Sequence, residues 1–400
     1  MTTLITNARL IEGDAIQPDS YVIIEDGIIT STGTGTPSEI NADEIIDAAG
    51  NYLSAGFIDM HTHGGGGADL MDGTVEAFLT VARTHARYGT TSFLTTTLTC
   101  PDDELFEAFR IFKEASKLNT DGARMLGFHL EGPYFAYNQR GAQDPANLKN
   151  PTPEHYNAIF AATDDIKRWS VAPELPGAIE FGRELKRRGI IASIGHTEAI
   201  TDQVIEAHEA GYSLMTHFYS AMSGVTRRNA FRYGGAVEAG YLLDDMDVEI
   251  IADGIHLPKE LLKLIYKIKG PDHIALITDS MRAAGMPEGE YMLGSMKEGY
   301  LVVVEDGVAK LMDRSAFAGS VATADRLIRT MINIAGVNLP DAIKMITATP
   351  ARILGINNKY GHIKPGYVAD MVIFDDSINV QRTVIEGKTV YDACQHALND

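Results

Sequence analysis

The chain has 400 residues, of which 45% are hydrophobic and 22% are charged, as in an ordinary globular protein. This length suffices for one large domain with an attachment, or for two domains. The formal net charge of -20 argues against a nucleic acid or an anionic membrane as partner, because either would need a basic face. An anionic small molecule stays compatible with this charge if a local cationic pocket exists.

The cysteines and the N-terminus indicate the compartment. Cys100 and Cys394 are the only cysteines and form no CxxC or framework pattern, which favours a reducing cytosol. The first nine residues lack a basic segment followed by a sustained apolar run, so we expect no secretion signal. No apolar segment reaches the ~20 residues needed to cross a bilayer. We therefore expect a cytoplasmic protein without a membrane partner.

Both ends of the chain read as short strands. Near the N-terminus, Asp26-Gly27 lies between two β-rich runs, which is a strong hairpin signal. Near the C-terminus, Asp370–Phe374 and Thr383–Val390 are likewise β-rich runs. Neither end has enough apolar residues for a core of its own. The sequence therefore predicts one small β-sandwich built from residues 1–52 and 356–400.

Between these ends, residues 53–355 alternate between apolar strands and helices. Apolar runs are expected for parallel strands that are buried on both faces. Eight such units in ~250 residues or more predict an α/β fold, a (β/α)8 TIM-type barrel. The expected strands are Phe57–His63, Thr91–Thr97, Met125–Glu131, Ser170–Glu174, Ile190–His196, Leu214–His217, Glu249–His256 and Ile274–Asp279. The expected helices include Val75–Tyr88, Asp103–Lys117, Gly177–Arg188, Asp202–Ala210, Pro258–Lys269 and Thr323–Ala335.

Potential metal ligands gather at the ends of these expected strands, where a barrel of this type carries its active site. Five of the 12 histidines lie there, beside a glutamate and an aspartate, and chance is a poor account of the whole set. The residues are His61, His63, Glu131, His196, His217, His256 and Asp279.

The first of these strands ends in His61-Thr62-His63, followed by four glycines. Residues two apart in a strand point to the same face, so both imidazoles can aim at one point. The glycines allow the backbone to turn sharply and leave open space. A buried strand with two hydrogen-bonded histidines is the alternative for this stretch alone.

Histidine and carboxylate side chains at a concave site suit a divalent metal such as Zn or Fe. Glu131, His196 and His217 would supply three protein ligands and leave a position for water. His61 and His63 would hold a second metal or support a single one. His129 lies deeper on the third strand and suits a supporting or core role better.

Asp279 ends the last expected strand and is the natural general base. A carboxylate beside a metal-activated water can take its proton and later return it to a leaving amine. The alternative is an aspartate that caps the next segment.

These motifs together resemble the N-acetylglucosamine-6-phosphate deacetylases of the amidohydrolase superfamily. The motifs occur over nearly the whole chain in the family's order. They are the run from Gly56 to Gly67, His129-Leu130-Glu131-Gly132-Pro133, Ile194-Gly195-His196-Thr197, Thr216-His217, Ala252-Asp253-Gly254-Ile255-His256 and Ile277-Thr278-Asp279. The resemblance implies a (β/α)8 barrel with a β-sandwich from both termini. It also implies hydrolysis of a sugar acetamide to acetate and an amine.

The resemblance also implies site roles. Glu131, His196 and His217 match the family's metal ligands, and Asp279 matches its catalytic acid/base. His61 and His63 match a pair that supports a second metal in some members, so one or two ions per chain are expected.

Substrate contacts follow from the same resemblance. His256 matches a substrate-contacting histidine, and Gln143 matches a loop position near the substrate. Arg228, with Arg227 beside it, aligns with an arginine that binds the 6-phosphate, often across a homodimer interface. A guanidinium fork suits phosphate. The expected partners are therefore a sugar phosphate and a second copy of the chain.

Two departures concern which sugar is bound. Ser220, followed by Ala221, replaces a family asparagine near the sugar, and the loop after Arg228 lacks the usual Glu-Pro-Gly run. An N-acetylgalactosamine 6-phosphate deacetylase is therefore a second hypothesis. A cyclic-amide hydrolase of the dihydroorotase type is disfavoured because the fourth strand lacks a lysine. A non-catalytic metal- or sugar-binding barrel is disfavoured because Asp279 accompanies the three ligands.

Overall fold

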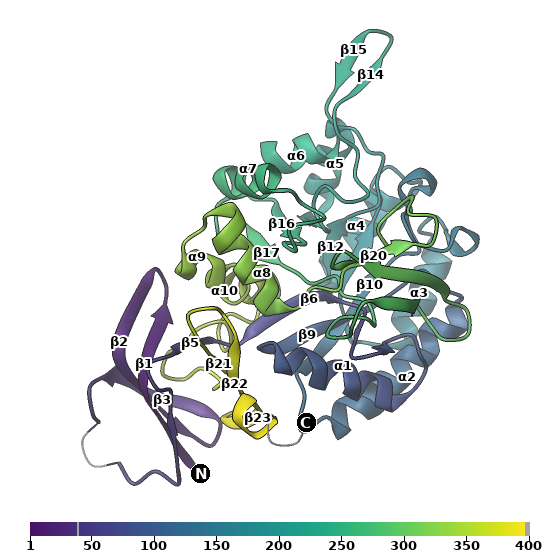
Figure 1. The fold of residues 1–400 in the computed structure, drawn as a ribbon. Coiled ribbons are helices and arrows are strands. Elements are labelled where there is room, and N and C mark those ends of the chain that lie inside the picture. The colour runs from purple at the N-terminus through teal and green to yellow at the C-terminus, as the bar shows by residue number, and fades with distance from the viewer. Residues whose placement is uncertain (38–39, 397–400) are drawn as a thin grey trace.

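The computed structural model of the protein describes residues 1–37 and 40–396, without the side chains of Arg228 and His396. Its centre is a barrel of eight parallel strands, ordered as in the chain (Figure 1). The predicted (β/α)8 barrel is therefore confirmed. The strands are β6 (Phe57–Thr62), β9 (Thr90–Thr97), β10 (Arg124–Glu131), β11 (Ile166–Val171), β12 (Ile191–Ile194), β13 (Tyr212–Met215), β16 (Asp247–Ile250) and β17 (Ile274–Leu276).

The barrel closes just beyond the end of β17. The Asp279 N–H donates to the carbonyl of His61 at 2.9 Å. Below this contact, Asp59 on β6 accepts hydrogen bonds from the hydroxyls of Thr62 and Thr278 at 2.7 and 2.5 Å. These bonds join β6 to the segment that follows β17. They fix the positions of two predicted site residues, His61 and Asp279.

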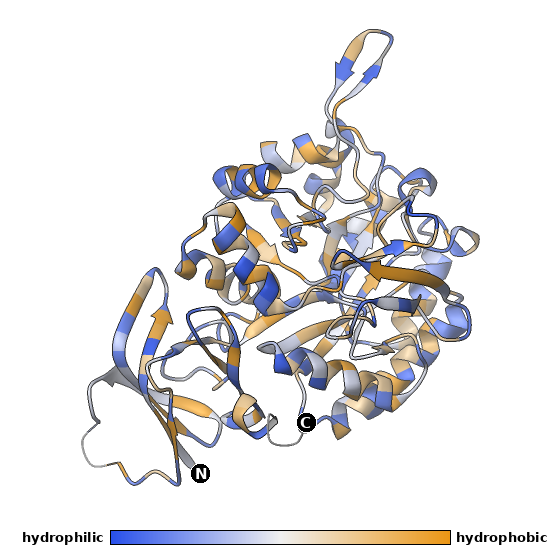
Figure 2. Ribbon diagram, viewed as in Figure 1, coloured by the Kyte–Doolittle hydropathy of each residue, from blue (hydrophilic) through white to orange (hydrophobic). Residues whose placement is uncertain are grey.

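Helices surround the barrel, and the apolar strands lie inside them (Figure 2). In α4, for example, Phe181 and Leu185 are buried, and the helix stops at Gly189, whose φ of +70° suits a C-terminal cap. The six helices named from the sequence agree closely with the structure. The helices are α1 (Val75–Arg87), α2 (Asp102–Leu118), α3 (Pro153–Ala162), α4 (Ala178–Arg188), α5 (Thr201–Ala210), α6 (Ala236–Leu242), α7 (Lys259–Lys269), α8 (Ala324–Thr330), α9 (Leu339–Lys344), α10 (Ala348–Ile353) and α11 (Ala393–His396), with short turns of other helix types at Tyr137–Gln139, Pro145–Asn147 and Met331–Ala335.

Two predicted strands were placed wrongly. The fourth was expected at Ser170–Glu174, but β11 ends at Val171, and Pro173 lies just beyond, where it has no N–H for the ladder. The seventh was expected to reach His256, but β16 ends at Ile250. There the Asp253 side chain accepts from the N–H groups of Ile255 and His256, both at 2.8 Å, and bends the chain into a turn.

Both termini build one separate β-domain, as the sequence predicts. β5 (Tyr52–Ala55) pairs with β1 (Thr2–Glu12) from the N-terminus and with β21 (Met371–Phe374) from the C-terminus. The Asp26-Gly27 hairpin is also confirmed, with φ values of +48° and +82°. The other strands of this sheet are β2 (Ala15–Glu25), β3 (Ile28–Thr34), β4 (Glu44–Asp47), β22 (Val380–Ile385) and β23 (Lys388–Asp392).

Three further small sheets were not predicted. An antiparallel sheet of β18 (Gly289–Leu293), β19 (Tyr300–Glu305) and β20 (Val308–Leu311) follows the last barrel strand. A hairpin of β14 (Thr226–Arg228) and β15 (Phe231–Tyr233) projects far from the barrel (Figure 1). A short pair, β7 (Gly64–Gly65) and β8 (Ala68–Asp69), follows β6. None of the described helices has both the length and the apolar character for a membrane span.

Candidate active site

The candidate site lies at the carboxyl ends of the barrel strands, in a cavity of about 330 Å³ that opens to solvent. Segments after seven of the barrel strands, all except β11, and the β18–β20 insertion contribute to its wall. The cavity brings together most of the predicted site residues, namely His63, Glu131, Gln143, His196, His217, Ser220, Ala221, His256 and Asp279.

Glu131, His196 and His217 form the first group of potential ligands. Glu131 Oε1 lies 3.1 Å from His196 Nε2 and 3.0 Å from His217 Nε2. The two imidazole nitrogens are 3.2 Å apart. Three donor atoms from three different strand ends therefore converge on one point.

His61, His63 and Asp279 form the second group. The Nε2 atoms of His61 and His63 lie 3.2 Å apart, and Asp279 Oδ1 lies 3.3 and 3.2 Å from them. The prediction that the two histidines share one face of their strand is thus confirmed. Asp279 lies close enough to both rings to act either as a ligand or as a base beside them.

Glu131 faces both groups. Its Oε1 points to His196 and His217, whereas its Oε2 lies 3.2 Å from His63 Nε2. The two groups therefore form one continuous site around a buried carboxylate. His129 lies beneath it, fully buried, with Nε2 2.7 Å from the Ser170 hydroxyl and its ring against His61.

The backbone turns three of these side chains inward. His196, His217 and Asp279 have φ values of +49°, +29° and +46°. Residues other than glycine rarely adopt this left-handed region, and such strain gathers at functional sites. Each of the three follows the end of a barrel strand, so the turn re-aims the side chain across the mouth of the barrel.

The donor atoms fit a bound divalent cation. His196 Nδ1 lies 2.7 Å from the Gln139 carbonyl, which can only accept, so Nδ1 carries the proton and a neutral ring presents a lone pair at Nε2. That lone pair faces the Glu131 carboxylate, an arrangement that a cation between them makes favourable. Ligand atoms around a tetrahedral ion with bonds near 2.1 Å are about 3.4 Å apart, close to the separations in both groups.

The electrostatics of the site agree with this fit. Burial disfavours the charged forms of His61 and His63, but Asp279 and Glu131 outweigh it and raise the pKa of His61 to about 9 and that of His63 to about 10. Burial also opposes ionisation of Glu131, yet His61, His196 and His217 hold its pKa well below the usual range. The carboxylates stay ionised and gather positive charge into the pocket.

A buried ion pair that the sequence analysis missed supports His61 from below. Arg168 on β11 makes a two-pronged contact with Glu249 on β16, and neither side chain is exposed. Glu249 Oε2 in turn lies 3.5 Å from His61 Nδ1. The sequence did contain a signal for this pair: an arginine and a glutamate lie inside apolar strands, and charged residues that are buried there need a partner.

Four of the predicted substrate residues line the cavity but differ in their contacts with the protein. Asp253 Oδ2 lies 2.8 Å from His256 Nδ1, which leaves Nε2 for a ligand, and the Phe317 ring lies 4.7 Å from the His256 ring. Ser220 and Ala221 line the cavity directly after His217. Gln143 also lines it, but its amide already binds protein groups, as described below.

Of the two predicted phosphate arginines, only Arg227 can be placed relative to the cavity. Arg227 is exposed on β14 of the projecting hairpin and is not among the described residues that line the cavity. The Arg228 side chain lies outside the described part of the structure. The structure therefore does not bring Arg227 to the potential metal ligands of the same chain.

Comparison with known proteins identifies the family. The amidohydrolase family model matches residues 52–390. The N-acetylglucosamine-6-phosphate deacetylase of Lysinibacillus sphaericus is 34% identical over 391 residues, which cover 97% of each chain. The N-acetylgalactosamine-6-phosphate deacetylase of Escherichia coli O157:H7 is 32% identical and covers 97% of this chain and 99% of its own.

Solved structures of similar fold belong to the same family. The N-acetylglucosamine-6-phosphate deacetylase from Pasteurella multocida superposes with a TM-score of 0.90 at 27% identity, covering 97% of this chain and 99% of its own. A variant of the Mycobacterium smegmatis enzyme, in complex with N-acetyl-D-glucosamine-6-phosphate, gives 0.88 at 27% identity with the same coverage. The chain therefore belongs to the amidohydrolase family and, within it, to the N-acetylglucosamine-6-phosphate deacetylase family.

Proposed function

We propose that the protein hydrolyses the acetamide of N-acetylglucosamine 6-phosphate and releases glucosamine 6-phosphate and acetate. The observation that carries this proposal is the convergence of Glu131, His196 and His217 beside Asp279 in one open cavity. The relatives named above, which span the whole chain, support the same substrate class.

Glu131, His196 and His217 are the proposed ligands of one divalent ion, Zn or Fe, and His61 and His63 are the proposed ligands of a second. Such an ion would polarise the acetamide carbonyl and lower the pKa of a water molecule. The second group matches the first in the spacing of its donor atoms, which supports two ions per chain.

Asp279 is the proposed general base and acid. Burial opposes its ionisation, but His61 and His63 lower its pKa, so its carboxylate is ionised near neutral pH. It accepts the proton of the attacking water and returns it to the sugar nitrogen as the C–N bond breaks. His256 Nε2 holds the sugar or its carbonyl, since Asp253 occupies Nδ1.

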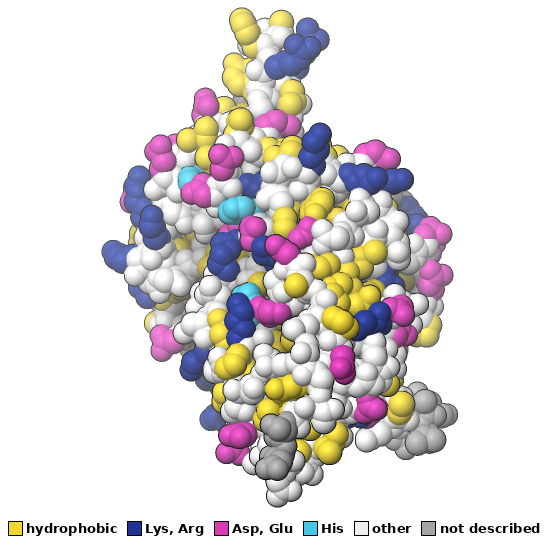
Figure 3. Space-filling view, turned by 90° about the vertical axis from the view of Figure 1, so that its left-hand side faces the viewer, with side chains coloured by type: hydrophobic (Ala, Val, Ile, Leu, Met, Phe, Trp, Pro, Cys, Tyr) yellow, Lys and Arg dark blue, Asp and Glu magenta, His cyan; other side chains and the backbone are white. Residues whose placement is uncertain are grey.

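The projecting hairpin supports the proposal of a homodimer. Val225, Phe231 and Tyr233 are 59%, 72% and 39% exposed, and apolar and basic side chains gather on the hairpin (Figure 3). An isolated two-stranded hairpin is marginally stable in water, so a second copy is the natural support. We propose that Arg228, with Arg227 beside it, binds the 6-phosphate from this hairpin, in the cavity of the partner subunit.

A second candidate substrate is N-acetylgalactosamine 6-phosphate. Ser220 lines the cavity, and one relative with 32% identity carries that substrate's name. The two sugars differ in the direction of one hydroxyl group, so Ser220 and Ala221 are the residues we propose to contact it. As for location, the two unbridged cysteines agree with the cytoplasm.

A panel of acetylated sugar phosphates, assayed for acetate release with Zn or Fe, tests the proposal. We expect kcat/KM to be highest for N-acetylglucosamine 6-phosphate. A higher value for the galactosamine epimer would favour the second candidate. No acetate from any member of the panel, with the protein folded and metal-loaded, would reject both.

A further inference from the structure

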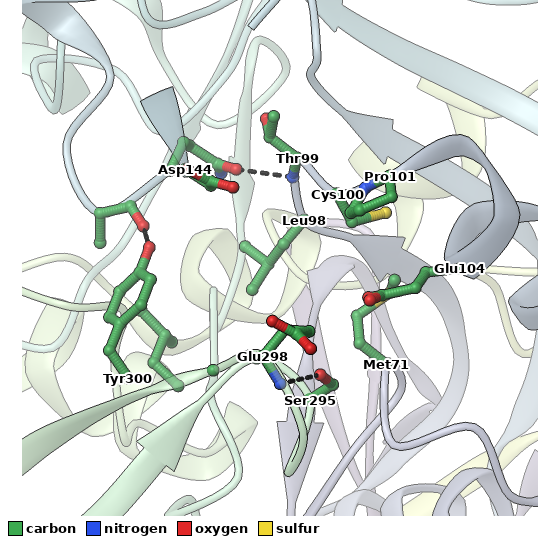
Figure 4. Close-up of a pocket in the computed structure, with 15 residues that line it drawn as sticks. Met71, Leu98, Thr99, Cys100, Pro101, Glu104, Asp144, Ser295, Glu298 and Tyr300 are labelled. Atoms are coloured by element: carbon green, nitrogen blue, oxygen red, sulfur yellow. Dashed lines mark hydrogen bonds between the residues drawn. The ribbon is translucent and has the colours of Figure 1, made fainter. Parts of the chain in front are cut away.

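Gln143 forms a hydrogen bond with Glu131, the carboxylate that faces both groups of potential metal ligands. It lies on the loop between β10 and α3 and is only 6% exposed. Its Nε2 lies 2.9 Å from Glu131 Oε2. Its Oε1 accepts the backbone N–H of Thr99 at 2.8 Å, the bond that Figure 4 shows at Thr99.

The chemistry of its two partners fixes the orientation of this amide. The Thr99 N–H can only donate, so the atom that faces it must be the amide oxygen. The NH₂ group must then face Glu131, and an ionised carboxylate can only accept. Gln143 therefore donates to Glu131, and a flipped amide would lose both bonds.

This hydrogen bond determines how the Glu131 carboxylate is turned. Oε2 is held toward Gln143 and His63, so Oε1 is held toward His196 and His217. We propose that Gln143 is a positioning residue that presents Glu131 Oε1 to His196 and His217 and Oε2 to His63, and so raises the affinity of the site for divalent cations. The inference rests on the proposed function only in taking Glu131 as a ligand.

Gln143 also borders a second hollow, which Leu98, Leu293 and Tyr300 line (Figure 4). Its buried amide is held there by the hydrogen bonds to Thr99 and Glu131. The Tyr300 hydroxyl also donates to the carbonyl of Ala142, which ties the loop to the β18–β20 insertion.

The loop that carries Gln143 also contacts His196, a second proposed metal ligand. The Gln139 carbonyl accepts from His196 Nδ1, as described above. The side-chain amide of Gln139, in contrast, makes no hydrogen bond within the described residues. Gln139→Met therefore provides a matched control, because it changes the same residue type on the same loop and keeps the carbonyl.

The test measures Zn²⁺ binding to chelator-stripped, full-length protein with a competing chromophoric chelator. Gln143→Met fills a similar volume but cannot donate, and we expect its Kd for Zn²⁺ to rise about 10- to 100-fold. The visible spectrum of the Co²⁺-loaded variant should shift, since the ligand geometry changes. Gln139→Met should bind Zn²⁺ like wild type.

Gln143→Asn gives the same test if Gln143→Met does not fold. Its amide is one methylene shorter and cannot span both partners, so a comparable rise in Kd is expected. Wild-type Zn²⁺ affinity and an unchanged Co²⁺ spectrum in a folded Gln143 variant would overturn the inference. Because acetate release is not measured, this result is independent of the proposed deacetylase activity.

Discussion

The carboxylate of Asp279 lies beside the Nε2 atoms of His61 and His63, and its contribution to catalysis can be separated from metal binding. Asp279→Asn keeps the size of the side chain but removes the base. We expect the variant to retain the ion at Glu131, His196 and His217 and to lose about 10²- to 10⁴-fold in kcat. Metal content and acetate release, measured on the same sample, check this. Wild-type turnover in the variant would exclude Asp279 from the mechanism.

His61 and His63 determine how many ions the site holds. In wild type we expect close to two ions per chain, because both groups have donor atoms at similar separations. The double variant His61→Gln/His63→Asn should hold close to one. Metal analysis per chain, on protein loaded with excess Zn²⁺ and then desalted, gives the count. An equal metal content in both proteins would contradict the two-ion proposal.

At the level of residues, the sequence was informative where spacing alone decides proximity. His61 and His63 meet because they are two apart at the end of β6, where the chain is still extended. Glu131, His196 and His217 meet because parallel strands end at one edge of the barrel. The Gln143–Glu131 bond was not predictable, since it depends on how a long loop folds back over the mouth.

Among the elements, strands β11 and β16 are joined by the buried pair of Arg168 and Glu249. Glu249→Gln leaves the arginine without a charged partner, and the loss of one partner of a buried pair costs about 3–5 kcal/mol. Urea unfolding of the metal-free protein at pH 7 measures this. The exposed pair of Arg183 and Glu180 offers a control, because Glu180→Gln should cost less than about 1 kcal/mol.

The stabilisation by the pair of Arg168 and Glu249 should decrease at low pH. Burial opposes ionisation of Glu249, but Arg168 lowers its pKa below the unfolded value of about 4.3. A depressed carboxyl pKa stabilises the fold above the unfolded pKa, and this contribution is lost as the pH falls through the folded pKa. The difference between wild type and Glu249→Gln should therefore shrink below about pH 4. An undiminished difference there would contradict the ion-pair explanation.

The elements also show what the sequence pattern could not decide. The fourth and seventh strands were misplaced because local turn chemistry at Pro173 and Asp253 ended them early. The β18–β20 insertion was missed, although Asp306-Gly307 between valine-rich runs is the same hairpin signal as Asp26-Gly27. The insertion has no effect on the count of barrel strands, so the fold class was still predictable.

For the whole molecule, the projecting hairpin leads to an expectation about assembly. If it contacts a second copy, Phe231→Glu should weaken the dimer at least about tenfold, because a charge would replace a central apolar contact. Analytical ultracentrifugation over a range of concentrations measures this. Leu118→Glu, at an exposed apolar position on α2, is the control. A monomeric wild type would contradict the homodimer and the phosphate site across it.

We propose that the molecule as a whole is a metal-dependent deacetylase that acts on a hexosamine 6-phosphate. The most direct test of this activity is acetate release from N-acetylglucosamine 6-phosphate by the full-length protein, first stripped by a chelator and then reloaded with Zn²⁺. We expect negligible turnover in the stripped protein and full recovery on reloading, with N-acetylglucosamine lacking the phosphate a far poorer substrate. Folded, fully metal-loaded protein that releases no acetate would contradict this activity.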